Sequence, residues 1–343
     1  MRQVSFNFYG QKVCVASDWP EALSLLKKDF DLFYSENSYS DNCDLKLFIL
    51  KKDPKEISTP ELVSKSQSQN SITYQLGHVR YNDYYGKLLS IFDYNKEEAQ
   101  LYCLNIDKVH EVAYLLILSR VGKMLDLKGL HKLHAFAVSY KEIAFVCMMP
   151  MKGGKSTLLL ELLKTKEVKM ISDDIPLIDI MGNVYSFPMK IGVNEDSSQK
   201  LELQNPEENL YTLQREHYGK KIFINSKGLG ERVELPGKKF KKVIIAEAFR
   251  FNSSETRLVS SSIFKTFKGL FKHGVVGIGL PMILEYFWEF GVIDFVKKSQ
   301  IFLSRLLTFS IFTIKSTRIS IYLGKNPDRA AEEILRFLKK KSQ

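Results

Sequence analysis

Residues 149–157 read MPMKGGKST, and the predicted fold follows from them. Its end, Gly154-Lys155-Ser156, matches the end of the phosphate-binding pattern G-x-x-x-x-G-K-[ST], whereas Met149 stands where that pattern has its first glycine. A glycine before the lysine lets backbone N–H groups face a phosphate, and the following helix presents its positive N-terminal end to the same anion. The predicted nucleotide-binding residues are Gly153, Gly154, Lys155, Ser156 and Thr157.

The segments around this loop have the order that such a site requires. Residues 135–149 form an apolar run with a polar interruption at 139–142, which predicts two strands joined by a hairpin turn. Residues 158–166 predict a helix, and 168–171 predict a short strand. Strand, glycine loop, helix and strand in succession favour a phosphate site over a basic turn that only opens an amphipathic helix.

Two adjacent carboxylates, Asp173 and Asp174, follow the strand 168–171. Adjacent strand residues point to opposite faces, so the two carboxylates can do different work. One can hold Mg²⁺, a hard cation that prefers oxygen ligands, and the other can accept a proton from an attacking hydroxyl. Lys155 would supply charge to the β- and γ-phosphates, and the Ser156 hydroxyl can ligate the metal. In isolation, such a pair is more often a turn or a helix cap.

The stretch from His134 to Asp174 resembles the catalytic domain of the HPr kinase/phosphorylase family, whose fold is related to phosphoenolpyruvate carboxykinase. A histidine 21 positions before Lys155 (155 − 134), the Gly-Lys-Ser loop and the aspartate pair carry the resemblance. It implies that Asp173 is the catalytic base, that Asp174 and Ser156 lie at the metal, and that His134 orients the carboxylates. It also implies ATP and Mg²⁺ as cofactors.

These residues predict an ATP-dependent kinase that transfers the γ-phosphate to a serine-type hydroxyl on a peptide, a protein or a small molecule. Residues 185–192 lack the acidic, arginine-containing segment that HPr kinases carry, and the more divergent similarity extends over about 130–343. A nucleotide-binding regulator or scaffold that has lost turnover is therefore the alternative. The reverse reaction, phosphorolysis of a phosphoserine, is also compatible with the sequence.

The predicted fold class is α/β, with a small N-terminal α+β domain over 1–105 and a P-loop kinase domain with a helical C-terminal part over 106–343. In the first domain we expect a hairpin at 4–15, a helix at 20–33 capped by Asp18, and a strand at 44–50. A polar loop at 54–70 precedes three strands over 72–102, with breaks at Gly77, Gly86 and around Asn95. A helix at 108–127 leads to the second domain.

The composition is compatible with several classes of binding partner and does not distinguish between them. The formal net charge of +11 suits nucleotides, acidic proteins or anionic membranes, and no nucleic-acid module is present. The four cysteines show neither metal-ligand spacing nor a disulfide pattern, so we expect buried thiols in a reducing cytoplasm. No signal peptide or spanning segment is evident. Homo-oligomers are expected only by analogy with HPr kinases.

The C-terminal half contains a basic and apolar region. Three lysines (Lys265, Lys268 and Lys272) recur at helical spacing among phenylalanines, and an apolar stretch follows over 274–296. This pattern indicates a groove for an acidic partner, an in-plane membrane helix, or a core helix pair with a solvated lysine face. Further candidates for phosphate contact are Lys190, Arg215, Lys220 and Lys221.

Overall fold

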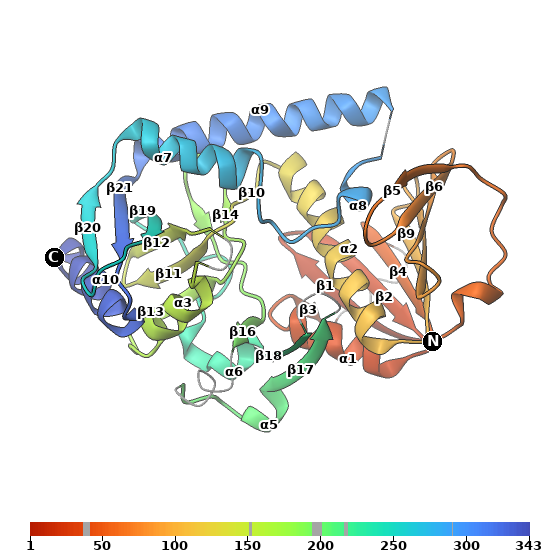
Figure 1. Ribbon diagram of the computed structural model, residues 1–343, viewed down its shortest axis with the longest axis horizontal. Helices are drawn as coiled ribbons and strands as arrows, with labels where there is room; N and C mark the ends of the chain where they lie inside the picture. Colours follow the sequence, from red (N-terminus) through yellow and green to blue (C-terminus); the bar gives the residue numbers. More distant parts are fainter. Residues whose placement is uncertain (37–41, 151–152, 194–200, 216–218, 290) are drawn as a thin grey trace. The chain divides into compact units, whose positions relative to one another are not determined.

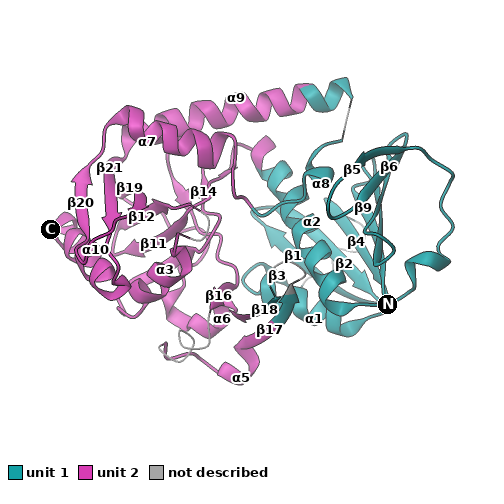
Figure 2. Cartoon of the chain, in the orientation of Figure 1, with its two compact units in different colours: residues 1–125, 213–220, 281–295 teal, residues 126–212, 221–280, 296–343 magenta. Residues whose placement is uncertain are grey.

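The computed structural model describes residues 1–343 except 37–41, 151–152, 194–200, 216–218 and 290 (Figure 1). With 35% helix and 32% strand in several mixed sheets, the chain is mixed α/β, which confirms the predicted class at that coarse level. It forms two compact units, each built from separate stretches of chain (Figure 2). Unit 1 holds residues 1–125, 213–220 and 281–295, and unit 2 holds 126–212, 221–280 and 296–343.

Unit 1 is organised around a sheet with the strand order β3-β1-β2-β4-β9-β8-β7-β6-β5. Its pairs are antiparallel except β2–β4 and β4–β9, which are parallel. The strands are β1 (Arg2–Phe8), β2 (Gln11–Ser17), β3 (Tyr34–Ser35), β4 (Leu45–Leu50), β5 (Ser64–Gln67), β6 (Ile72–Leu76), β7 (Val79–Asp83), β8 (Leu88–Asp93) and β9 (Glu98–Cys103). The predicted hairpin and the predicted breaks after residue 72 are confirmed, but the breaks separate four strands, β6 to β9, and not three. The loop 54–70 contains the short strand β5 and a 3₁₀ turn, η1 (Pro54–Glu56).

Two helices of unit 1 pack together. His110 on α2 (Ile106–Leu127) lies 2.8 Å from Asp29 at the end of α1 (Pro20–Asp29), and both side chains are fully buried. The ring of Phe30 stacks on Tyr114. The prediction that Asp18 caps the first helix is wrong, because its Oδ1 accepts a hydrogen bond from the backbone N–H of Lys51 at 2.9 Å.

One pair of cysteines corrects the sequence analysis. Cys14 on β2 and Cys43 before β4 form a disulfide, with their Cα atoms 6.1 Å apart. The prediction of four thiols is therefore wrong for this pair. The parallel pairing of β2 with β4 brings the two cysteines together, and a long-range pairing of this kind cannot be read from cysteine spacing. Cys103 and Cys147 are buried free thiols, as predicted.

Unit 2 is a sheet covered on both faces, with the strand order β13-β11-β12-β19-β21-β20. Helices α3 (Lys155–Leu163) and α10 (Pro327–Ser342) pack together and against one face. Helices α7 (Ile263–Leu270) and α9 (Val292–Lys315) contribute Leu270, Phe309 and Phe312 to the core on the other. The strands are β11 (Phe136–Tyr140), β12 (Ile143–Met148), β13 (Val168–Ser172), β19 (Lys242–Arg250), β20 (Arg257–Ser260) and β21 (Thr317–Leu323).

Smaller elements make up the rest of the secondary structure of the described residues. Two short sheets have the orders β10-β14-β15 and β16-β18-β17. Their strands are β10 (His131–Lys132), β14 (Leu177–Ile178), β15 (Val184–Tyr185), β16 (Ile191–Val193), β17 (Leu210–Arg215) and β18 (Gly219–Ile224). The remaining turns are α5 (Pro206–Asn209), α6 (Ser226–Leu229), η2 (Gly230–Arg232), η3 (Phe271–Val275), a π-helical turn, and α8 (Leu284–Phe287). Among the described residues, no helix is long and apolar enough to cross a bilayer.

Candidate functional site

Strand direction brings three predicted segments to one edge of the unit 2 sheet. β11 is antiparallel to both β12 and β13, so β11 begins where β12 and β13 end. His134 precedes β11, the glycine loop follows β12, and Asp173-Asp174 follow β13. The residues that the sequence analysis singled out therefore converge at one place, although about twenty residues of chain separate each from the next.

The glycine loop is shaped by its backbone. Met149 is buried, with 2% of its surface exposed, and the Gly153 N–H donates to the Pro150 carbonyl at 2.9 Å. Residues 151–152 of the predicted motif lie outside the described residues. A side chain at Gly153 would meet the Pro150 oxygen at 2.8 Å, and one at Gly154, where φ is +95°, would overlap the Arg250 guanidinium. Both positions therefore favour glycine.

The loop leads into α3 earlier than predicted. Gly154 is the N-cap and Lys155 is the first helical residue, so Lys155, Ser156 and Thr157 form the first turn. The first N–H groups of a helix have no partner within the helix and carry a partial positive charge. The side chain of Ser156 is half-buried and that of Thr157 is exposed. The first turn of α3 can therefore bind an anion.

Lys155, Asp174 and His134 form a compact cluster. The Lys155 ammonium donates to Asp174 Oδ1 and lies 2.7 Å from His134 Nε2, which is 3.5 Å from the same Asp174 oxygen. Burial alone would raise the pKa of Asp174. The interactions with His134 and Lys155 outweigh it, and the net pKa is lowered. Asp174 is thus held as a carboxylate, with its side chain 31% exposed.

Asp173 behaves in the opposite way. Burial, followed by the negative charge of Asp174, raises its pKa to about 7, against the opposing charges of Lys155 and Lys221. Its Oδ1 is buried without a hydrogen-bond partner among the described residues. A half-buried carboxyl with one buried oxygen and an elevated pKa is the arrangement expected of a group that accepts and releases a proton near neutral pH.

His134 is fixed from its other side. Its Nδ1 donates to the Ile278 carbonyl at 2.9 Å, which leaves Nε2 to face Lys155 and Asp174. Gly279, with φ of +92°, lies so close that a Cβ there would overlap the imidazole. The ring of His273 is 5.5 Å away, and burial, with the nearby His134, lowers its pKa to about 4. His273 is therefore neutral at pH 7.

The available metal donors form only part of a coordination shell. Among the described residues, no group of three or more His, Cys, Asp and Glu side chains could hold a metal ion. Ser156 and Asp174 offer hard oxygen donors, and Mg²⁺ usually keeps several waters and binds one or two carboxylates together with phosphate oxygens. This donor set fits Mg²⁺ delivered with a nucleotide better than an independent metal centre.

Arg250, which the sequence analysis did not select, lies at the same edge. It ends β19, the parallel neighbour of β12, and its guanidinium packs on Gly154. A small cavity beside the loop is lined by Gly153, Gly154, Thr157, Leu158, Arg250, Leu323, Gly324, Pro327 and Ala330. The carboxyl ends of parallel strands are the usual ligand edge of such sheets. The pairing of β12 with β19, almost a hundred residues apart, is what the sequence does not show.

The other basic candidates differ in their surroundings. Lys190 is buried, and its ammonium lies 4.9 Å from the centre of the Phe223 ring, which Lys221 approaches to 5.6 Å. Lys221 also acts electrostatically on Asp173. Lys220 is exposed, and the side chain of Arg215 lies outside the described residues. Of these four, Lys221 has the clearest connection to the carboxylate pair.

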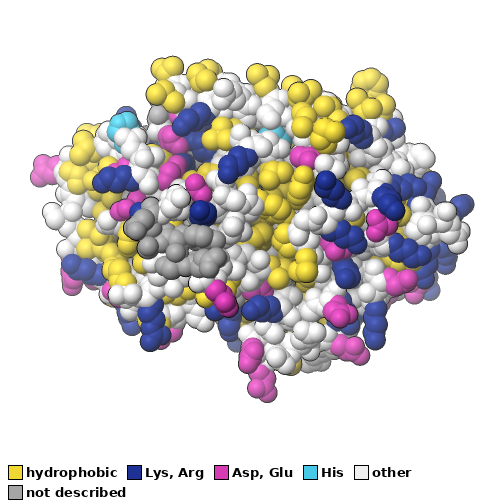
Figure 3. All heavy atoms as spheres, turned by 180° about the vertical axis from the view of Figure 1, so that it is seen from behind, with side chains coloured by type: hydrophobic (Ala, Val, Ile, Leu, Met, Phe, Trp, Pro, Cys, Tyr) yellow, Lys and Arg dark blue, Asp and Glu magenta, His cyan; other side chains and the backbone are white. Residues whose placement is uncertain are grey.

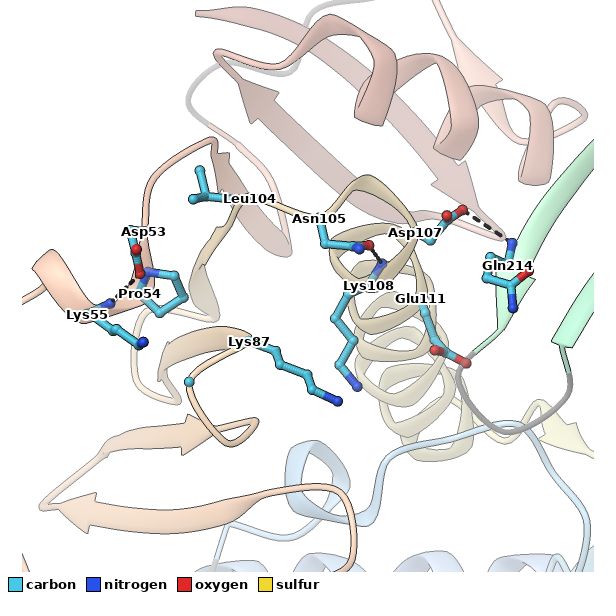
Figure 4. Close-up of a pocket in the computed structure, with 11 residues that line it drawn as sticks. Asp53, Pro54, Lys55, Lys87, Leu104, Asn105, Asp107, Lys108, Glu111 and Gln214 are labelled. Carbon is cyan, nitrogen blue, oxygen red and sulfur yellow. Dashed lines mark hydrogen bonds between the residues drawn. The ribbon is translucent and has the colours of Figure 1, made fainter.

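A larger cavity, of about 520 Å³, lies in unit 1 and has a different character (Figure 4). Lys55, Lys87 and Lys108 line it together with Asp53, Asp107 and Glu111, so its charges balance. Two of its polar side chains cap the start of a helix: Asp53 accepts from the Lys55 N–H at 3.0 Å, and Asn105 accepts from the Lys108 N–H at 2.9 Å. Among the described residues, its lining contains no histidine, serine or cysteine that could act as a nucleophile.

Comparison with known proteins adds no further assignment. No family model matches the chain, and no curated protein matches it. The resemblance to the HPr kinase/phosphorylase family therefore rests on His134, the glycine loop and the aspartate pair.

Proposed function

We propose that this protein is an ATP-dependent kinase that transfers the γ-phosphate to a serine-type hydroxyl. The observation that carries the proposal is the meeting of Lys155, at the N-terminal turn of α3, with the Asp173-Asp174 pair at one edge of the sheet. Phosphoryl transfer requires an anion cradle, a positive charge on the phosphates, an oxygen donor for Mg²⁺ and a base for the hydroxyl. Each requirement has a candidate side chain or backbone group here.

Support for the phosphate side comes from Lys155 and the glycine backbone. Lys155 is now paired with Asp174, so both charges are satisfied within the partly buried cluster. A bound triphosphate would give the ammonium a new partner, and Asp174 would then be available, with Ser156, to ligate Mg²⁺. The metal would contribute charge neutralisation on the phosphate oxygens. Arg250, packed on Gly154, is placed to contribute a second positive charge.

Support for the acceptor side comes from Asp173 and His134. Asp173 has a buried oxygen without a protein partner among the described residues, so it can accept the hydroxyl proton. His134, held by the Ile278 carbonyl, fixes Asp174 and Lys155 in relation to each other. The strand, loop, helix and strand order around them favours the P-loop kinase fold of the HPr kinase and phosphoenolpyruvate carboxykinase type.

The test separates nucleotide binding from phosphate transfer. Asp173→Asn should bind Mg-ATP with nearly wild-type affinity, measured by calorimetry, and lose about 10²- to 10⁴-fold in transfer of labelled γ-phosphate to lysate fractions. Asp328→Asn, an exposed carboxylate on α10 with a side chain 58% exposed, is the control and should leave both unchanged. An Asp173→Asn variant that transfers phosphate as fast as wild type contradicts the assignment of the base.

A nucleotide-binding regulator is the second candidate function. It is favoured by Met149, a buried side chain where the motif has its first glycine. If the wild-type protein binds Mg-ATP tightly but transfers no phosphate to any peptide, protein or metabolite fraction, this reading replaces the kinase. If the wild-type protein does not bind Mg-ATP, both candidate functions are contradicted.

A further inference from the structure

Helix α9 exposes an apolar face that the kinase proposal does not use. Val296, Leu303, Leu307 and Ile314 follow each other at helical spacing, and their side chains are 50%, 62%, 55% and 67% exposed. Helical geometry places these four residues along one line on the outer surface. The inner surface of the same helix is buried through Ile301, Arg305, Phe309 and Phe312.

The outward face is also free of charge over most of its length. Between Ser299 and Ile314 the only charged residue is Arg305, which is buried and paired with Asp126. Residues 296–314 of the helix span about 28 Å. Hydrophobic side chains stand along the upper edge of the space-filling view, where α9 runs in Figure 1 (Figure 3). An exposed apolar strip of this length marks an interaction surface.

Basic and aromatic side chains lie beside this strip. The Phe271 ring, after α7, contacts the Phe302 ring of α9 edge-on, with centroids 6.5 Å apart. Lys268 and Lys272 are exposed on the same turns as Phe271, and Phe264 exposes 86% of its surface. The carboxylate facing these lysines is Glu247, which is partly buried. The flank of the strip therefore carries exposed ammonium groups next to exposed aromatic rings.

We propose that the face formed by α9 (residues 296–314) and the lysine flank of α7 docks in the plane of an anionic lipid surface. An amphipathic helix with large apolar side chains and nearby lysines binds at the boundary between headgroups and acyl chains. Positive charges within a Debye length of anionic lipids add to this binding, and salt screens them. In the described chain, no helix can span the bilayer, so α9 lies on the surface.

The test uses full-length protein and vesicles without nucleotide, so its outcome is independent of kinase activity. Vesicles of phosphatidylglycerol and phosphatidylcholine should carry the protein in a flotation assay, and pure phosphatidylcholine vesicles should carry at least tenfold less. The double variant Leu303→Asp/Leu307→Asp should lose at least tenfold in binding to the anionic vesicles. The control Leu235→Asp replaces an equally exposed leucine (62%) elsewhere in unit 2 and should bind like wild type.

A second variant tests the charge. Lys268→Glu/Lys272→Glu should weaken binding to anionic vesicles at low salt and leave the circular dichroism spectrum unchanged. Equal binding to neutral and anionic vesicles, or full binding by the leucine double variant, would overturn the proposal. So would self-association of the wild type that the leucine double variant abolishes, if no vesicle binding accompanies it, because the face would then join two copies of this chain.

Discussion

At the scale of single residues, Asp173 and Asp174 are neighbours in sequence whose pKa values shift in opposite directions. The pKa of Asp174 is lowered because its interactions with His134 and Lys155 outweigh burial. The pKa of Asp173 is raised because burial disfavours its charged form, and the negative charge of Asp174 adds to this. Two carboxylates driven apart in this way can serve as a charged ligand and a proton acceptor within one site. Sequence identifies the pair, but only the contacts of Asp174 with Lys155 and His134 distinguish its members.

The raised pKa of Asp173 predicts a pH dependence of stability. Because the folded pKa is about 7 and the usual value is 3.8, the folded protein holds a proton that the unfolded chain has released. The contribution of this bound proton to the free energy of unfolding is complete below about pH 4 and is lost as the pH rises through about 7. Asp173→Asn cannot titrate, so it should gain stability relative to wild type between pH 5 and pH 8. Urea unfolding of both proteins, without metal or nucleotide, measures the difference, and a difference independent of pH would refute the prediction.

Lys155 should dominate nucleotide affinity. Lys155→Ala removes a charged donor, which contributes about 1.5–3 kcal/mol, so the Kd for Mg-ATP should rise roughly tenfold to a hundredfold. Lys164→Ala, at the other end of α3, is the matched control because Lys164 pairs with Glu161 and Asp328. Calorimetric titration compares the two variants. Equal affinity of wild type and Lys155→Ala for Mg-ATP would contradict the proposal that this lysine binds the phosphates.

At the scale of elements, local signals predict much of the fold. The hairpins at Gly10 and at 139–142, the strand 168–171 and the breaks at Gly77 and Gly86 all occur, because apolar alternation and turn residues act locally. The predictions are wrong where contacts with distant parts of the chain determine the structure. Asp18 bonds Lys51 instead of capping α1, and Cys14 bonds Cys43 because β2 pairs with β4. The glycine loop and the aspartate pair can be predicted from the sequence. The position of Arg250 beside them follows only from the pairing of β12 with β19.

The start of α3 gives a prediction that separates strain from function. Gly154→Ala and Gly182→Ala both place a side chain at positive φ, +95° and +82°, which costs about 1–2 kcal/mol. Only the first overlaps the Arg250 guanidinium; the nearest atoms to the second are 3.6 Å away or more. Both variants should lose similar stability in urea unfolding, but only Gly154→Ala should weaken Mg-ATP binding. Equal loss of binding in both would show that the effect is global destabilisation.

At the scale of the whole molecule, unit 1 depends on a segment distant in sequence. Tyr286, in α8, is fully buried, and its carbonyl accepts a hydrogen bond from Arg120 at 2.7 Å. Arg80, fully buried in β7, donates to the carbonyl of Glu285. The order of elements along the chain does not show that residues 281–295 return to complete the unit that begins at residue 1. Local patterns contain no information on such a return, which is set by burial and hydrogen bonding over nearly two hundred residues.

This return predicts that residues 1–125 do not fold alone to a native-like state. Without residues 281–295, the buried guanidinium groups of Arg80 and Arg120 lose their carbonyl acceptors, at about 1–3 kcal/mol each. Loss of a buried aromatic side chain such as Tyr286 costs about 3–5 kcal/mol more. The fragment should therefore unfold without a cooperative transition, and adding a peptide of residues 281–295 should restore one, followed by circular dichroism and by the fluorescence of Trp288. The same peptide with Tyr286→Ala should restore little, whereas a fragment that already unfolds cooperatively at the full-length midpoint would show that the segment is dispensable.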